Sequence, residues 1–228
     1  FKAPPRLRFV ARVLGWPFKW FGLKGDPALP PATRALTALG PAYIKFGQIL
    51  STRPDIVGDE LALQLKYLQD KLPPFLTAIA KKMIEAELEL PIDQVFSEFS
   101  EPVAAASIAQ VHRAKIAETG ADVAVKVLRP GIEKAFRKDI DAFYLAASVI
   151  DLLAPSTRRL RPMDVIAHFE GVVMGELDFR LESSAAAEFA ANTAKDAGFQ
   201  VPRPVWYLSG RQMMTLDWAE GANMADND

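Results

Sequence analysis

The chain has 228 residues, of which half are hydrophobic, and its 27 lysine and arginine residues nearly balance 28 aspartate and glutamate residues. This balance excludes a generally basic nucleic-acid-binding protein and an acidic disordered tail, and the length suits one domain or two small ones with a proper core. The absence of cysteine excludes a disulfide scaffold, a thiol nucleophile and a cysteine-ligated metal site, and His112 and His168 lie too far apart in sequence to suggest a shared metal site.

The N-terminal segment, residues 1–29, is basic and aromatic. Residues 1–25 contain six lysines and arginines, no acidic residue and two of the four tryptophans. Such a segment suits an anionic membrane surface, where the rings lie among the headgroups and the cations lie near lipid phosphates. An amphipathic helix docked on its own domain explains the pattern equally well. No run of 18 apolar residues suggests a membrane span.

Residues 30–97 have the pattern of short helices separated by prolines. The apolar spacing predicts a helix over residues 32–53 with a bend at Gly40-Pro41, and a second helix from Asp59 to about Lys71. A third helix follows Pro73-Pro74, and its apolar stripe consists of Ile79, Met83, Ile84 and Leu88. We therefore expect a helical region before any sheet.

From Phe99 the hydrophobic period drops toward two, which is typical of strands. The expected elements are strands at 102–106, 110–116 and 123–128, helices at about 131–153 and 162–192, and a final hairpin of 205–208 with 213–218. The first three strands predict an antiparallel meander, and the order of the elements indicates an α+β fold.

Lys126 ends the sequence Val123-Ala-Val-Lys126, which matches the V-A-[IV]-K strand of protein kinases. Because burial of an unpaired ammonium is costly, this side chain must reach solvent or contact an anion. A lone strand lysine is most often a solvated edge residue. Here it follows a small-residue loop and precedes an acid-bearing helix, which is the order of a kinase N-lobe.

The loop before Lys126 is rich in alanine where kinases have glycine. Its residues are Ala104, Ala105, Ala106, Ser107, Ile108 and Ala109. Alanine keeps the backbone N–H donors that could bind a phosphate, but its Cβ disfavours positive φ angles. The segment alone therefore fits either an unusual phosphate loop or a tight apolar hairpin without a ligand.

Glu176, Asp178 and Glu182 lie close together on the predicted helix 162–192. Asp178 and Glu182 are four residues apart and are expected on one helix face, whereas Glu176 points in another direction. One acid can therefore reach a site shared with Lys126 while another faces a different partner. A solvated face with a Glu176–Arg180 pair is the simpler alternative.

Together these segments resemble the UbiB (AarF/ADCK) family of atypical kinase-like proteins. The matching motifs, in chain order, are Lys45-Phe-Gly-Gln48 (K-x-G-Q), the Ala-rich loop of 102–112, Val123 to Gly131, Glu176-Leu-Asp178 (E-x-D) and the segment 214–221. The match runs from about residue 30 to the end, and the ordered set is much more specific than any single motif.

The resemblance implies an architecture and a role for each matching residue. It implies a helical extension at 30–97, a kinase-like N-lobe at 98–220 and a linker at 221–228. The N-lobe would contain five antiparallel strands, a long helix and an inserted helix. Lys126 and its helix partner Glu182 would be catalytic. The implied nucleotide-binding residues are Lys126, loop residues 104–109, Asp217 and Ala219, and the implied regulatory residues are Lys45, Gln48, Glu176 and Asp178. In the family the lysine of K-x-G-Q can pair with the first acid of E-x-D.

The resemblance further implies an ATP- or ADP-binding, kinase- or ATPase-like protein that supports ubiquinone biosynthesis, including ring hydroxylation of quinone precursors. Its expected partners are nucleotide, quinone-lipid precursors or biosynthesis proteins, and the cytosolic face of the inner membrane. The sequence ends at the hinge, before the lobe that carries the Mg²⁺ ligands, so it is interpreted as an N-terminal fragment without a metal site and without activity of its own. The alternative is a non-catalytic peripheral-membrane module that binds nucleotide or lipid and chaperones quinone precursors.

Overall fold

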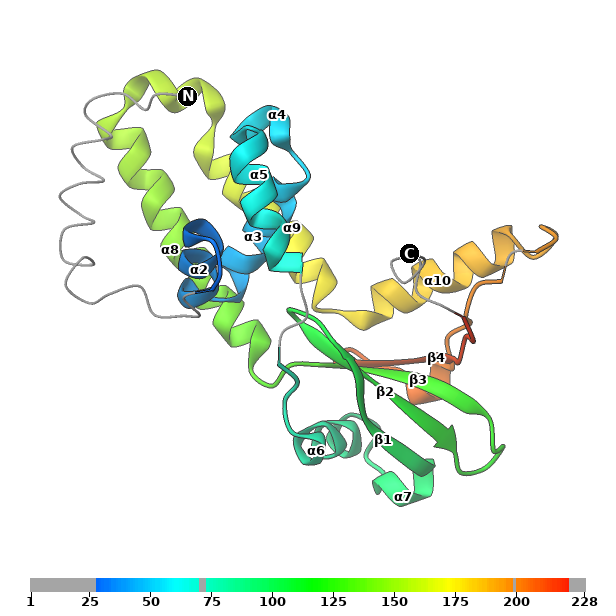
Figure 1. Cartoon of the computed structure of the whole chain (residues 1–228). Helices are drawn as coiled ribbons and strands as arrows, with labels where there is room; N and C mark the ends of the chain where they lie inside the picture. The colour runs from blue at the N-terminus through cyan, green and yellow to red at the C-terminus, as the bar shows by residue number, and fades with distance from the viewer. Residues whose placement is uncertain (1–27, 70–72, 199, 222–228) are drawn as a thin grey trace. The chain divides into compact units, whose positions relative to one another are not determined.

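The computed structural model describes residues 28–69, 73–198 and 200–221 (Figure 1). The basic aromatic segment predicted to contact a membrane lies almost wholly outside these residues, as does most of the 221–228 linker. The chain divides into two compact units, one of residues 1–70 with 131–174 and the other of 71–130 with 175–228. This division differs from the predicted boundary at residue 97, because the third predicted helix groups with the sheet and the first long helix groups with the N-terminal helices.

The first unit is helical in its described residues. Its elements are α2 (Pro31–Leu39), α3 (Pro41–Ser51), α4 (Pro54–Val57), α5 (Asp59–Lys66), the 3₁₀ turn η1 (Tyr67–Gln69), α8 (Ile132–Leu153), η2 (Pro155–Leu160) and most of α9 (Pro162–Glu176). Proline occupies the first turn of α2, α3 and α4, where its missing N–H costs no helical hydrogen bond. The predicted bend at Gly40-Pro41 separates α2 from α3, and Gly40 has a φ of +149° that favours glycine.

An aromatic cluster joins three helices of this unit. The Phe143 ring of α8 lies 4.5 Å from the Tyr43 ring and 5.5 Å from the Phe46 ring of α3, between ring centroids. The Phe169 ring of α9 meets Phe46 and Phe143 edge to face. Such edge-to-face pairs add about 0.5–1.5 kcal/mol each beyond the area they bury, so they fix α3 between α8 and α9.

The second unit is an antiparallel sheet with helices. The strands are β1 (Phe96–Ala105), β2 (Ala109–Ile116), β3 (Asp122–Leu128) and β4 (Met213–Asp217), in the order β1-β2-β3-β4, and the helical elements are α6 (Thr77–Leu88), α7 (Ile92–Val95), α10 (Phe179–Asn192) and η3 (Trp206–Leu208). Figure 1 shows α6 and α10 on opposite sides of the sheet. The predicted three-strand meander and the α+β fold are confirmed.

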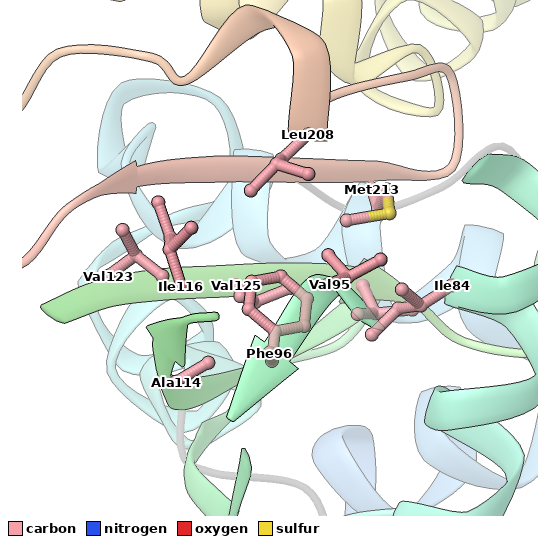
Figure 2. Close-up of a cluster of buried hydrophobic side chains, with 10 residues drawn as sticks. Ile84, Val95, Phe96, Ala114, Ile116, Val123, Val125, Leu208 and Met213 are labelled. Atoms are coloured by element: carbon pink, nitrogen blue, oxygen red, sulfur yellow. The ribbon is translucent and has the colours of Figure 1, made fainter. Parts of the chain in front are cut away.

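Alternation along β3 assigns the two faces of the sheet. Val123, Val125 and Val127 are buried in a cluster that includes Ile84 of α6 and Met213 of β4 (Figure 2). The intervening residues, among them Lys126, therefore point to the face that α10 covers. Burial of one complete strand face stabilises the sheet and directs the lysine away from the apolar core.

Three predicted elements differ from the structure. The strand predicted at 102–106 begins earlier, as β1 (Phe96–Ala105). The prediction of a fifth strand at 205–208 is wrong within the described residues, because this segment forms the 3₁₀ turn η3 and only Pro204 makes an isolated bridge, to Leu216. The Val205 N–H donates to Thr215 O of β4 at 2.8 Å, but the Leu208 N–H turns back to Val205 O at 3.0 Å and closes the 3₁₀ turn. The predicted helix 162–192 is two helices, α9 and α10, separated at Leu177 and Asp178.

Candidate functional site

The central feature of the sheet unit is an ion pair between Lys126 of β3 and Glu182 of α10. Lys126 Nζ lies 2.6 Å from Glu182 Oε1 and 2.8 Å from Oε2, and donates to both oxygens. The Lys126 side chain is 26% exposed and the Glu182 side chain 48% exposed. The ammonium also lies 4.8 Å from the centroid of the Phe179 ring, which is fully buried. The charged pair therefore stands at the edge of an apolar surface and stays accessible to solvent.

The surface around Lys126 is apolar and only partly buried. The strand register places Val111 of β2 and Met214 of β4 on either side of Lys126, and pairs Ala124 with Leu216. All of these side chains belong to the face opposite the valine core. Met214 is buried, whereas Val111, Ala124 and Leu216 are half-buried. Sequence reasoning missed this apolar platform, although the two-residue period on either side of Lys126 could have predicted it.

Asp178 begins α10. Its Oδ1 accepts a hydrogen bond from the Arg180 backbone N at 3.1 Å, and its carboxylate accepts two more from the Arg180 guanidinium at 2.9 and 2.6 Å. The hydrogen bonds from Arg180 hold the pKa of Asp178 below its usual value. An N-cap residue lies outside the regular helix, so the prediction that Asp178 and Glu182 share one face of a continuous helix is wrong.

Glu176 is the last residue of α9, before the break at Leu177. Within the described residues the carboxylate that pairs with Lys126 is that of Glu182, not that of Glu176. The expected contact between Glu176 and Lys45 joins residues of different units and stays a prediction.

The Ala-rich segment divides between strand and turn. Ala104 and Ala105 are in β1, Ala109 begins β2, and Ala106, Ser107 and Ile108 form the turn between them. The turn is closed by the Ala106 N–H, which donates to Ala109 O at 2.8 Å. Among the described residues, no acceptor receives the N–H of Ser107 or Ile108. The loop can therefore offer two neighbouring backbone donors to an anion, fewer than the predicted six residues suggested.

The predicted hinge residues follow β4. Asp217 ends the strand, and its Oδ2 accepts a hydrogen bond from the Arg203 backbone N at 3.2 Å. The register pairs Asp217 with Val123, so its side chain belongs to the valine face rather than the Lys126 face. Ala219 follows in exposed coil. Only backbone groups of Asp217 therefore remain suited to a ligand on the Lys126 face.

The K-x-G-Q motif lies on α3 in the helical unit. Gln48 Nε2 donates to the Leu68 carbonyl of η1 at 2.8 Å. A Cβ at Gly47 would overlap the Leu68 side chain and come within 2.8 Å of a Leu36 methyl group, so glycine allows α3 to pack closely on α2 and η1. Lys45 is half-buried on the same helix. The structure thus assigns Gly47 and Gln48 packing roles, and the regulatory role stays a prediction.

Asp139 of α8 is a buried acid that sequence reasoning missed. It is 8% exposed, and its Oδ2 accepts a hydrogen bond from the Ala42 N–H, in the first turn of α3, at 3.1 Å. Burial raises the pKa of Asp139, an effect that the Ala42 hydrogen bond partly opposes. The sequence contained one signal, since Asp139 falls between Phe136 and Ile140 on the buried stripe of α8.

A buried polar chain links β1, β2 and the segment before α6. The Phe75 N–H donates to Gln110 Oε1 at 2.9 Å, Gln110 Nε2 lies 2.9 Å from His112 Nε2, and His112 Nδ1 lies 2.8 Å from the Ser100 carbonyl. A carbonyl only accepts, so Nδ1 carries the proton and Nε2 accepts from Gln110. Burial lowers the pKa of His112, and the network favours the neutral ring.

Two kinds of feature are absent from the described residues. No group of three or more histidine, aspartate and glutamate side chains in these residues is arranged to hold a metal ion. None of the helices found in the same part of the chain combines the length and apolarity needed to cross a membrane.

Comparison with known proteins defines the class. A family model for the ABC1 atypical kinase-like domain matches residues 67–228, and the chain belongs to this family. It is 39% identical over 193 residues to a "Probable protein kinase UbiB" of Marinobacter nauticus, covering 84% of this chain and 35% of that protein. Proteins with the same name from Shewanella baltica and Pseudomonas aeruginosa are 40% identical over 204 residues and 37% identical over 227 residues. These two alignments cover 89% and 97% of this chain, and 37% and 42% of the relatives.

The comparisons confirm the UbiB resemblance drawn from the motifs, and the chain spans less than half the length of these curated relatives. The kinase-like match agrees with a sheet unit in which a strand lysine pairs with a helix glutamate.

Proposed function

We propose that the Lys126 face of the sheet binds a nucleotide, with Lys126 contacting its phosphates. The observation that carries this proposal is the partly exposed Lys126–Glu182 pair beside an apolar platform. An ion pair with this exposure contributes about 0–1 kcal/mol to stability, so stability alone gives little reason to place a lysine there. A polyphosphate would use the ammonium as a cation that Glu182 holds in position.

The chemistry of the surrounding residues fits such a ligand. The half-buried side chains of Val111, Ala124 and Leu216 suit one face of a planar base. The free N–H groups of Ser107 and Ile108 are donors that suit phosphate oxygens. When bound, Mg²⁺ would neutralise phosphate charge.

At the level of the whole protein, we propose an ATP-dependent atypical kinase or ATPase that supports ubiquinone biosynthesis at the cytosolic face of the inner membrane. The name UbiB carried by the relatives supports this role. Lys45, Gln48, Glu176 and Asp178 are its proposed regulatory residues, since they form the K-x-G-Q and E-x-D motifs.

Titration of the chain with MgADP tests the nucleotide site. Lys126→Met is expected to weaken binding at least tenfold, about 1.4 kcal/mol, because the phosphates lose a charged partner. Lys115→Met is the matched control, since Lys115 on β2 also forms an ion pair, with Glu98 at 2.8 Å. Equal affinities of wild type and both variants would refute the role of Lys126, and absence of binding by the wild type would refute the site itself.

A second proposed function, a peripheral-membrane module, is favoured by the turn between α8 and α9. Exposed apolar side chains gather there: Leu152, Leu153, Leu160, Met163 and Val165. Leu152 is 74% and Leu160 63% exposed. Three arginines share the turn, Arg158, Arg159 and Arg161, although Arg161 pairs with Asp164. Exposed leucines beside arginines suit insertion into an anionic lipid headgroup region.

Flotation with phosphatidylglycerol-containing vesicles tests this second function. The double variant Leu152→Ser with Leu160→Ser should float less than wild type, and phosphatidylcholine vesicles should bind the wild type less. Leu63→Ser is the control, because Leu63 of α5 is 62% exposed and lies on another helix. If the double variant floats as well as wild type, the α8–α9 turn is not the contact; removal of residues 1–25 then tests the N-terminal segment.

A further inference from the structure

Arg129 directly follows β3 and contacts the turn of the Ala-rich loop. Its Nε donates to Ala106 O at 2.9 Å, and its backbone N–H donates to Ile108 O at 2.8 Å. Its Nη2 donates to Pro73 O at 2.9 Å, and its guanidinium carbon lies 6.0 Å from the centroid of the Phe75 ring. One side chain therefore ties the loop to the segment that leads into α6.

The guanidinium approaches the loop from the side of the valine core. Phe75, over which it lies, packs against the core cluster that contains Val125 and Val127. Lys126 belongs to the opposite face of the sheet and pairs with Glu182 of α10. Arg129 and Lys126 therefore lie on different faces of the sheet, and Arg129 does not compete for Glu182.

The partners of Arg129 are neutral. Within the described residues its hydrogen bonds go to two carbonyl oxygens, and no carboxylate pairs with it. The side chain is half-buried, and this burial lowers the pKa of the guanidinium. A half-buried cation without a counter-charge costs desolvation free energy, so its position calls for a reason other than stability. Its positive charge behind the loop increases the attraction of the loop for an anion.

The segment that contains Pro73 is hydrogen-bonded to β2. The Phe75 N–H donates to Gln110 Oε1, and Gln110 is held by His112, both of them fully buried in β2. The carbonyl of Pro73 lies two residues before this point. The Pro73 carbonyl on one end of the guanidinium and the Ala106 carbonyl on the other end restrain the loop. The fork of an arginine matches two separated acceptors in a way that lysine does not.

We propose that Arg129 is a positioning residue of the nucleotide site, which holds the loop by the Ala106 carbonyl so that the Ser107 and Ile108 N–H groups stay available to phosphates. This inference rests on the proposed nucleotide-binding function. Positioning of the donors before binding reduces the ordering cost of the complex, so loss of Arg129 should weaken binding although Arg129 need not touch the ligand.

Two measurements on the whole chain test the inference. Hydrogen exchange of peptides covering residues 104–109, without nucleotide, should be faster in Arg129→Gln than in wild type. MgADP affinity should fall about tenfold in Arg129→Gln, close to 1.4 kcal/mol. Arg129→Lys should recover part of the loss, because it keeps the charge and can donate to one of the two carbonyls. Arg137→Gln is the control, since Arg137 is exposed on α8 and pairs with Glu133.

The two readouts separate this inference from the proposed function. Unchanged loop exchange in Arg129→Gln would overturn the inference whether or not nucleotide binds. Faster exchange with unchanged affinity would also overturn it, because the loop would then not position a ligand. If the wild type binds no MgADP, the proposed function fails, and the exchange experiment still decides whether Arg129 restrains the loop. If Arg129→Gln lowers the urea midpoint, its MgADP affinity no longer separates loop positioning from lost stability. The MgADP affinity of Arg129→Lys is then compared with wild type, and the inference requires it to be measurably weaker.

Discussion

Replacement of Asp139 tests how the helical unit holds α3. Asp139→Ala removes the carboxylate that accepts the Ala42 N–H at 3.1 Å, and Ala42 is fully buried. A buried donor left without a partner costs about 1–3 kcal/mol. Relief of the buried charge offsets part of this cost. We therefore expect Asp139→Ala to lower the free energy of unfolding by about 1–2 kcal/mol, and Asp139→Asn to lower it less, because asparagine still offers an oxygen to Ala42.

The pH dependence of the same variants gives a second test. Because the pKa of Asp139 is raised in the folded state, the folded protein binds this proton at a higher pH than the unfolded chain does. The Asp139 contribution to stability is therefore most favourable below the unfolded pKa of about 4, and is lost as the pH rises through the folded pKa. Asparagine has no such dependence, so Asp139→Asn should compare better with wild type at pH 7 than at pH 4.

Urea unfolding followed by far-ultraviolet circular dichroism at pH 7 and pH 4 measures both effects. Asp141→Asn is the matched control, because Asp141 is exposed on the same helix. If Asp139→Ala and Asp141→Asn have the same midpoint as wild type, the capping contact has no energetic role. A stability difference between wild type and Asp139→Asn that does not change with pH would refute the shifted pKa.

Two further predictions concern buried polar contacts. Burial lowers the pKa of His112. Its contribution to stability is therefore present above the unfolded pKa of about 6.5 and is lost as the pH falls through the folded pKa, by up to about 1.4 kcal/mol per pH unit. In urea titrations from pH 7 to 5, His112→Gln should flatten this loss, while His168→Gln, at an exposed site, should not. Gln48→Ala removes the hydrogen bond to the Leu68 carbonyl and should lower the free energy of unfolding by about 0.5–1.5 kcal/mol, measured by thermal or urea unfolding. Gln94→Ala, at an exposed site, should leave it unchanged. Equal midpoints for these two variants would contradict the packing role of Gln48.

Local patterns predicted the elements whose burial is periodic. The valine alternation in 123–128 predicted β3, and the proline-separated apolar stripes predicted α2, α3, α5 and α6. The pairing of Lys126 with Glu182 was implied by the resemblance to the UbiB family, and the two side chains do meet at hydrogen-bond distance. The strands and helices succeed because each needs only the spacing of residues along one element. The ion pair joins residues 56 positions apart, and only the family resemblance indicated it.

The remaining features depend on contacts that spacing does not contain. The Asp139–Ala42 hydrogen bond joins residues 97 positions apart, so no local pattern indicates it. The break at Leu177 and Asp178 was hidden because the apolar spacing continues across it, and the N-cap contact with Arg180 decides the boundary instead. The strand predicted at 205–208 failed because the Leu208 N–H bonds back to Val205 O, and the apolar run Val205 to Leu208 fits a strand or a 3₁₀ turn equally well.

The most direct measurement of the central claim is lysine labelling by an acyl-phosphate derivative of ATP, with peptide mass spectrometry. The reagent transfers its acyl group to a lysine amine beside the bound phosphates, with release of the nucleotide. We predict that Lys126 is labelled, that excess MgADP suppresses this labelling, and that Lys115, whose side chain is 35% exposed in its own ion pair, is not protected. Labelling of Lys126 at the same rate with and without MgADP, or no preference for it over Lys115, would contradict a nucleotide site on this face.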